Sequence, residues 1–78
     1  MKYLLIMTYS FDTDCQILQF ETEDLARKAL QKYAEEEYRT ETEENGWYAE
    51  IKHEENWYYA EVTSDGNTCY YHVASIVA

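Results

Sequence analysis

The sequence contains no proline, two glycines, two cysteines and only 6 basic residues, against 16 acidic residues in a chain of 78. The resulting net charge of −10 repels phosphate groups, because Lys and Arg are the side chains that neutralise them. We therefore expect neither nucleic acids nor anionic membrane surfaces to be direct partners.

Long apolar segments are also missing. A membrane-spanning helix needs about 20 apolar residues, whereas the apolar run near the start, residues 3–7, has five. Residues 8–12 follow this run without a small-residue cleavage site, so we interpret it as a first strand rather than a secretory leader. A cytoplasmic location is the expectation.

The two cysteines, Cys15 and Cys69, lie far apart in the chain and form no C-x-x-C motif. Secreted domains of this size usually carry four or more cysteines, paired in disulfides. The spacing therefore favours two free thiols over a disulfide.

Apolar residues are abundant despite the acidity. Hydrophobic residues make up 46% of the chain and aromatic residues 17%, which excludes a disordered chain. At this length we expect a single domain, residues 1–78, with a small core.

The first half of the sequence predicts a β-hairpin followed by a helix. Residues 3–11 are apolar at nearly every position, residues 12–14 carry the aspartates of a turn, and residues 15–20 form the returning strand. Thr22 is the expected N-cap of the helix, and two acidic residues in the first turn suit the helix dipole. The apolar stripe of this helix is Leu25, Ala26, Ala29, Leu30, Tyr33 and Ala34.

The end of this helix is ambiguous in the sequence. Residues 38–43 alternate like a short polar strand, and Asn45-Gly46 follows them. No apolar residue after Tyr38 marks an inner face, so a helix stopped by Gly46 is favoured.

The last third of the sequence is typical of β-structure. Residues 47–53 and 57–63 alternate, and the turn sequence Ser64-Asp65-Gly66-Asn67 leads into a final strand, residues 68–77. The sum is an α+β domain of order ββαβββ, in which one helix covers one face of an antiparallel sheet of about five strands.

The negative charge is concentrated in one segment. Residues 35–55 contain nine acidic residues against Arg39 and Lys52, which gives −7 of the total −10. One reading is a solvated segment that keeps a small protein soluble, and the other is an acidic face for a basic partner. The acidic residues are Glu35, Glu36, Glu37, Glu41, Glu43, Glu44, Glu50, Glu54 and Glu55.

The far face of the sheet is the second candidate surface, because a single helix covers only one face. Alternation places Trp57 and Tyr59 opposite Ala60 and Val62, and it adds Tyr48 and Tyr70 to the uncovered side. These aromatic residues are expected to form a protein-binding or dimer contact, with half-exposed cross-strand pairs as the alternative. The four candidates are Tyr48, Trp57, Tyr59 and Tyr70.

Motifs for catalysis or metal binding are not found in the sequence. The chain has no nucleophile motif, phosphate loop or H-E-x-x-H, so we expect no enzyme, no catalytic residue and no cofactor. Asp12-Thr13-Asp14 lacks the further ligands of a calcium loop, and the two histidines and two cysteines are too scattered for a zinc site.

Residues 8–14 (TYSFDTD), the Thr22-Glu23 helix start and residues 43–47 (EENGW) resemble short uncharacterised proteins of gut Firmicutes and their mobile elements. In size, acidity and lack of catalytic motifs the chain is also similar to anti-CRISPR and other anti-defence proteins of phages. Many of these mimic nucleic acid with clustered carboxylates.

The second resemblance implies a non-enzymatic inhibitor in the host cytoplasm. Its partner would be a basic host protein, such as a nucleic-acid-binding effector. Two alternatives are a homodimeric structural or regulatory module and a sponge for a small signalling nucleotide.

Overall fold

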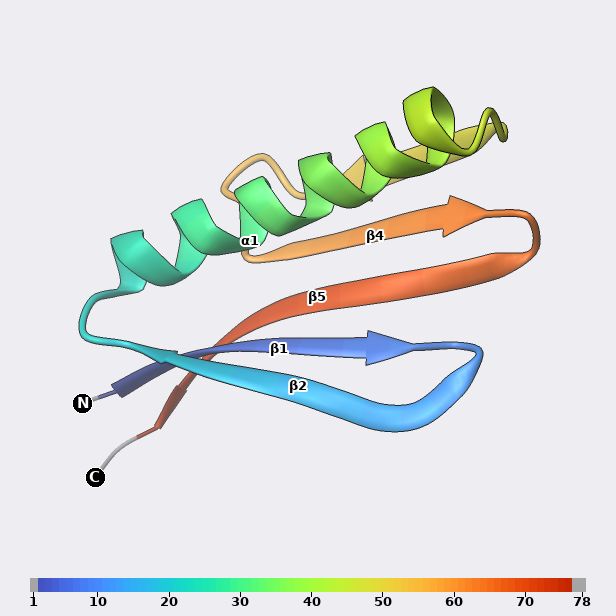
Figure 1. The fold of residues 1–78 in the computed structure, drawn as a ribbon. Coiled ribbons are helices and arrows are strands. Elements are labelled where there is room, and N and C mark those ends of the chain that lie inside the picture. Colours follow the sequence, from blue (N-terminus) through green and yellow to red (C-terminus); the bar gives the residue numbers. More distant parts are fainter. Residues whose placement is uncertain (1, 77–78) are drawn as a thin grey trace.

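Five strands and one long helix follow each other in the order ββαβββ in the computed structural model, which describes residues 2–76 (Figure 1). The α+β class and the element order predicted from the sequence are confirmed. The elements are β1 (Lys2–Tyr9), β2 (Asp12–Phe20), α1 (Glu23–Arg39), the short π-helical turn η1 (Thr40–Glu44), β3 (Ala49–His53), β4 (Tyr59–Ser64) and β5 (Asn67–Ile76).

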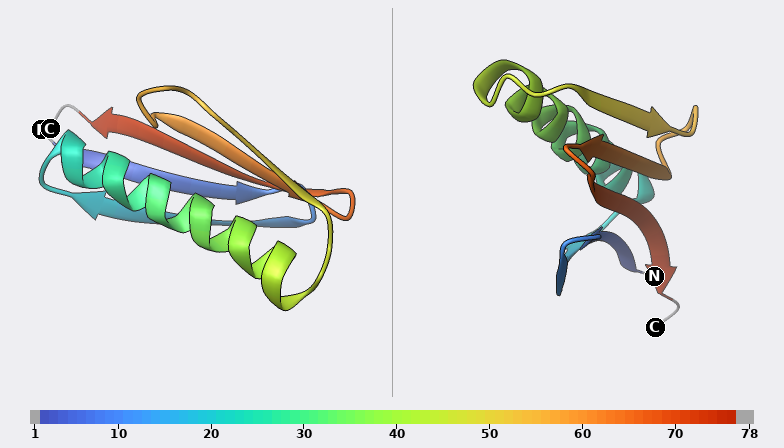
Figure 2. Two further views of the ribbon diagram at one scale, coloured as in Figure 1. Left: turned by 90° about the horizontal axis from the view of Figure 1, so that it is seen from above. Right: turned by 90° about the vertical axis from the view of Figure 1, so that its right-hand side faces the viewer.

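The strands form one antiparallel sheet in the order β2-β1-β5-β4-β3, and α1 lies across one of its faces (Figure 2). Alternation along the strands turns one set of side chains toward the helix. Leu5, for example, pairs with Leu18 on one side and Val73 on the other. The buried residues that α1 and the sheet share are Leu5, Met7, Leu30, Ala34, Ala60, Val62, Cys69 and Tyr71.

The start of α1 is capped as predicted. The hydroxyl of Thr22 accepts a hydrogen bond from the backbone N–H of Leu25 at 3.2 Å. Behind this cap, Ala26, Leu30 and Ala34 are fully buried at intervals of four residues. The buried stripe is narrower than predicted, because Leu25 and Tyr33 are exposed at its edges.

The helical interpretation of the segment after Tyr38 is confirmed. α1 runs into η1, and the N–H of Asn45 donates to the carbonyl of Thr40 at 3.0 Å. Gly46 then has φ +70, a conformation that glycine adopts at no steric cost, and it turns the chain out of the helix.

The first hairpin turns two residues earlier than predicted. Tyr9 pairs with Asp12, so Ser10 and Phe11 form the turn and Asp12 already belongs to β2. The turn is held from outside the hairpin, because the Ser10 hydroxyl accepts the N–H of Thr68 at 2.8 Å. A long-range contact of this kind has no local sequence signal.

The last three strands also differ in their bounds from the prediction. β3 begins at Ala49 rather than at residue 47, and β4 begins at Tyr59 rather than at residue 57. The turn between β4 and β5 is where it was expected, with Asp65 at φ 51 and Gly66 at φ 80. Residue 77, the end of the predicted last strand, lies outside the described residues. Within residues 2–76, no helix has the length and apolar composition that crossing a membrane requires.

Candidate functional site

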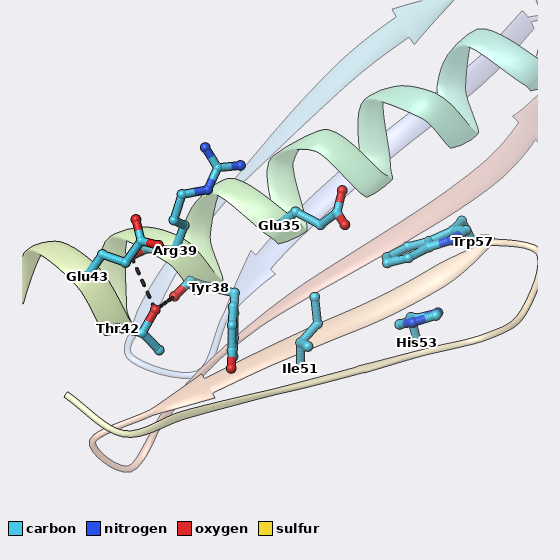
Figure 3. Close-up of a pocket in the computed structure, with 8 residues that line it drawn as sticks. All are labelled: Glu35, Tyr38, Arg39, Thr42, Glu43, Ile51, His53 and Trp57. Carbon is cyan, nitrogen blue, oxygen red and sulfur yellow. Dashed lines mark hydrogen bonds between the residues drawn. The ribbon is translucent and has the colours of Figure 1, made fainter. Parts of the chain in front are cut away.

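A groove of about 420 Å³ runs between the C-terminal half of α1 and strand β3 (Figure 3). Apolar and aromatic side chains come from both elements, whereas its carboxylates come from the helical side alone. The lining residues are Glu35, Tyr38, Arg39, Thr42, Glu43, Ile51, His53 and Trp57. The groove therefore combines aromatic surface with two acidic residues and one basic residue, Arg39.

Trp57 forms one end of this groove. Its backbone has φ 60, a left-handed conformation that is unfavourable for a bulky side chain. Its indole ring stacks on the ring of His53, with centroids 3.7 Å apart and planes 9° apart. The turn is pinned from α1, because Arg27 Nε donates to the carbonyl of Asn56 at 2.7 Å. The stacking on His53 and the hydrogen bond from Arg27 therefore stabilise the unfavourable backbone conformation of Trp57.

The placement of Trp57 corrects the sequence prediction. We expected Trp57 beside Tyr59 on the face away from the helix, but Trp57 packs against the core on the helix side. The reason is that β4 begins only at Tyr59. Trp57 lies in the preceding turn, where strand alternation does not apply.

The nine predicted acidic residues are spread over separate surfaces. Glu35, Glu36, Glu43 and Glu44 are exposed at the end of α1 and on η1. Glu36, Glu43 and Glu44 also surround a shallow hollow of about 250 Å³, together with Arg39 and Thr40. We call Glu35, Glu36, Glu43 and Glu44 the outer acidic group.

Glu37 and Glu41 turn toward the sheet instead. The thiol of Cys69 donates to Glu37 Oε1 at 3.9 Å, and the hydroxyl of Ser64 donates to Glu41 Oε2 at 3.2 Å. Burial, and then the neighbouring Glu41, raise the pKa of the Glu37 carboxyl. Burial likewise raises the pKa of the Cys69 thiol to about 11, so this thiol is protonated at neutral pH.

The helical period of the sequence could have predicted that Glu37 and Glu41 turn toward the sheet. Continuing the buried stripe from Leu30 and Ala34 by the helical period leads to positions 37 and 41. Because both residues are acidic, we did not extend the buried stripe of the helix to them: a charged side chain is rarely predicted to face a core.

The last three predicted acidic residues lie away from the end of α1. Glu50 is on β3, and its carboxylate accepts the hydroxyl of Tyr48 at 3.0 Å. Glu54 and Glu55 belong to the turn between β3 and β4, which Arg27 contacts from the first half of α1. The structure therefore does not assemble the nine residues into one face.

Two of the four predicted aromatic residues share the face away from the helix. Tyr59 is paired with His72, and Tyr70 with Glu61, across adjacent strands. The hydroxyl of Tyr59 donates to Glu61 Oε2 at 2.8 Å, and burial raises the pKa of Tyr59 to about 12. Tyr48 precedes β3 and is 80% exposed, so it is outside the paired part of the sheet.

Within residues 2–76, no group of three or more His, Cys, Asp or Glu side chains is arranged to hold a metal ion. Comparisons with protein-family models, with curated proteins and with solved structures gave no match. The chemistry that the described residues do offer is that of the groove: carboxylates beside aromatic rings, which suit a cation on an apolar stem.

Proposed function

We propose that this protein is a non-enzymatic inhibitor that binds a basic, nucleic-acid-handling protein of its host. The proposal rests on the groove between α1 and β3, which is lined by aromatic side chains and by the acidic residues Glu35 and Glu43. These two residues belong to the outer acidic group, which replaces the nine-residue face predicted from the sequence.

The groove fits a Lys or Arg side chain. Its methylene stem packs on Tyr38 and Ile51, and its cation pairs with Glu35 or Glu43. The stacked ring of Trp57 offers a further contact, since cations are attracted to the face of an indole. Binding of this kind uses surface that is already formed, which limits the entropy that is lost.

The rest of the outer acidic group extends the contact along the helix. At a rise of about 1.5 Å per residue, Glu36 and Glu43 are separated by two turns, or about 10 Å. Carboxylates spaced in this way occupy cations that would otherwise hold phosphates, so binding excludes the nucleic acid. Charge pairs of this type speed association and weaken with salt.

The test is a pull-down from host lysate with quantitative mass spectrometry, using the wild type and the variant Glu35→Lys/Glu43→Lys. We expect the wild type to capture a basic nucleic-acid-binding protein, and the variant to capture it at least tenfold less, since two attractive pairs become repulsive. Added nucleic acid should release the captured protein from the wild type.

The matched control is Glu54→Lys/Glu55→Lys, which makes the same charge change on the turn between β3 and β4. This control should retain capture. Equal loss in both variants would show that only the total charge matters, and capture that nucleic acid does not reverse would contradict inhibition by mimicry.

A further inference from the structure

A second groove, of about 400 Å³, lies between α1 and the hairpin of β1 and β2. Buried residues of β5 form its floor, whereas Phe11 in the hairpin turn and Tyr33 on α1 are 58% and 39% exposed and form its rim. We call this space the hairpin groove. Its aromatic residues are Tyr9, Phe11, Tyr33 and Tyr71, and its charged residues are Glu36 and Glu37.

The two grooves lie on opposite flanks of α1. Tyr38 and Thr42 line the groove between α1 and β3, whereas Tyr33 and Thr40 line the hairpin groove. The helical period places these two pairs on either side of the buried stripe that contains Leu30. The C-terminal half of α1 is therefore a ridge with an aromatic, acidic hollow on each side.

The charged residues that line the hairpin groove are all acidic. Glu36 and Glu37 contribute carboxylates, and no basic side chain lines this groove within residues 2–76. The three ion pairs of the same residues involve other side chains. The groove between α1 and β3, by contrast, is lined by Arg39 as well. The hairpin groove thus lacks a cation that would balance its carboxylates.

The pKa values of the groups around the hairpin groove agree with this charge pattern. Burial is the main cause that raises the pKa of Tyr9, of Glu37 and of the Cys69 thiol. Glu37 adds to the increase at both Tyr9 and Cys69. No basic side chain lowers any of these three pKa values. A cation in the groove would offset the cost of the half-buried charge on Glu37.

The aromatic residues indicate which cation fits. The rings of Tyr9 and Phe11 have their centroids 5.4 Å apart and their planes at 43°. A guanidinium group is planar, is less strongly hydrated than an ammonium group, and stacks on aromatic faces. It also donates two parallel hydrogen bonds to one carboxylate. Phe11 offers the stacking surface and Glu37 the acceptor, so the groove suits arginine better than lysine.

We propose that the hairpin groove binds an arginine side chain of the basic partner, which then contacts α1 on both flanks; the identity of this partner rests on the proposed function. A helix with its side chains is about 10–12 Å wide, so two basic side chains at roughly this spacing reach both grooves. Once one groove is occupied, the second side chain binds at a high effective concentration, which increases the affinity.

The experiment is a titration with N-acetylarginine amide, followed through the backbone amide signals of the isotope-labelled protein by NMR. We expect saturable shifts at Phe11, Thr40 and Cys69, which line the hairpin groove. The neutral analogue N-acetylglutamine amide should cause no shifts there. N-acetyllysine amide should bind several-fold more weakly, because its ammonium group keeps its water and does not stack.

Two variants test the residues of the hairpin groove. Glu37→Gln removes the charge, and Phe11→Ala removes the stacking ring at a position that is exposed and therefore tolerant of truncation. Each should weaken binding of N-acetylarginine amide at this groove about fivefold. The matched controls are Glu43→Gln, in the groove between α1 and β3, and Tyr48→Ala, an exposed ring outside both grooves. Both controls should leave the shifts at Cys69 unchanged.

A lack of saturable shifts at the hairpin groove would overturn the inference, as would equal binding of the glutamine or lysine amide. Unchanged binding in both Glu37→Gln and Phe11→Ala would overturn it as well. Shifts confined to Ile51 and Trp57 would also overturn it, but they would leave the proposed function standing.

The pull-down from host lysate separates the two proposals further. Phe11→Ala should capture several-fold less of the basic partner than Tyr48→Ala does, and equal capture would overturn the contact on both flanks of α1. If the hairpin groove binds N-acetylarginine amide but the wild type captures no basic protein, the proposed function is contradicted, whereas the preference of the groove for arginine is supported.

Discussion

Glu37 shows how tertiary contacts change the role of a single acidic residue. Its carboxylate contacts Cys69 in β5, and its pKa is raised by burial and by the neighbouring Glu41. A folded-state pKa above the unfolded value means that the folded protein binds the proton more tightly. The corresponding stability is present at low pH and is lost as the pH rises through the folded-state pKa.

This linkage predicts the effect of Glu37→Gln. The amide cannot ionise, so the variant should have a larger free energy of unfolding than the wild type at neutral pH. The difference should shrink at mildly acidic pH, where the wild-type carboxyl is protonated. Urea unfolding at both pH values measures it.

Glu36→Gln is the control, since it removes the same charge from an exposed neighbour. It should show a smaller change with pH. If Glu37→Gln is destabilising at neutral pH, the carboxylate is stabilised by its surroundings and the inferred sign is wrong.

At the scale of elements, α1 and its continuation η1 determine where the groove lies. Helical geometry extends beyond Arg39 and keeps Thr42 on the same side as Tyr38, while Glu43 lies at the edge of the groove (Figure 3). The Thr42 hydroxyl donates a hydrogen bond at 2.9 Å to the carbonyl of Tyr38, one of the backbone acceptors near the C-terminal end of α1. A short strand in this segment would have removed one wall of the groove.

The cap at the other end of α1 is testable by Thr22→Ala. Losing the hydroxyl leaves the N–H of Leu25 without its side-chain acceptor, which typically costs about 1 kcal/mol of stability. Chemical denaturation should show this loss, whereas Thr22→Ser should retain most of the stability. Equal stability of the Ala and Ser variants would mean that water replaces the cap.

At the scale of the whole molecule, the charge is divided between the two sides of the sheet. The outer acidic group lies at the end of α1 and on η1, whereas Glu50 and Glu61 on the strands are accompanied by Lys52, which is paired with Glu61. This division places the proposed basic partner at the groove between α1 and β3, beside the outer acidic group.

The concentration of acidic residues predicts a dependence of stability on salt. Screening reduces repulsion within the outer acidic group, so the free energy of unfolding should rise with NaCl. The variant Glu35→Gln/Glu36→Gln/Glu43→Gln/Glu44→Gln should show a weaker dependence. Urea unfolding at several NaCl concentrations measures the effect.

A control for this experiment replaces the chloride salt with another monovalent salt of equal ionic strength. The two salts should act alike, because Debye screening depends on ionic strength. Stability that falls with salt, or that rises equally in the neutralised variant, would show that the outer acidic group does not destabilise the fold.

Local signals in the sequence determined the fold class. The Thr22 cap, the buried positions Ala26, Leu30 and Ala34, and the turn at Gly66 each act within a few residues of the chain. Their physical causes are hydrogen bonding to the nearest backbone, helical spacing and the conformational freedom of glycine. They are therefore readable without a structure.

The composition of the candidate site was decided only by tertiary structure. The side on which Trp57 lies depends on where β4 begins, and the inward direction of Glu37 and Glu41 depends on where α1 meets the sheet. Both are set by packing between segments that are distant in sequence. For that reason the sequence revealed how many acidic residues the segment carries, and only the fold decided which of their carboxylates lie exposed beside the groove and which turn toward the sheet.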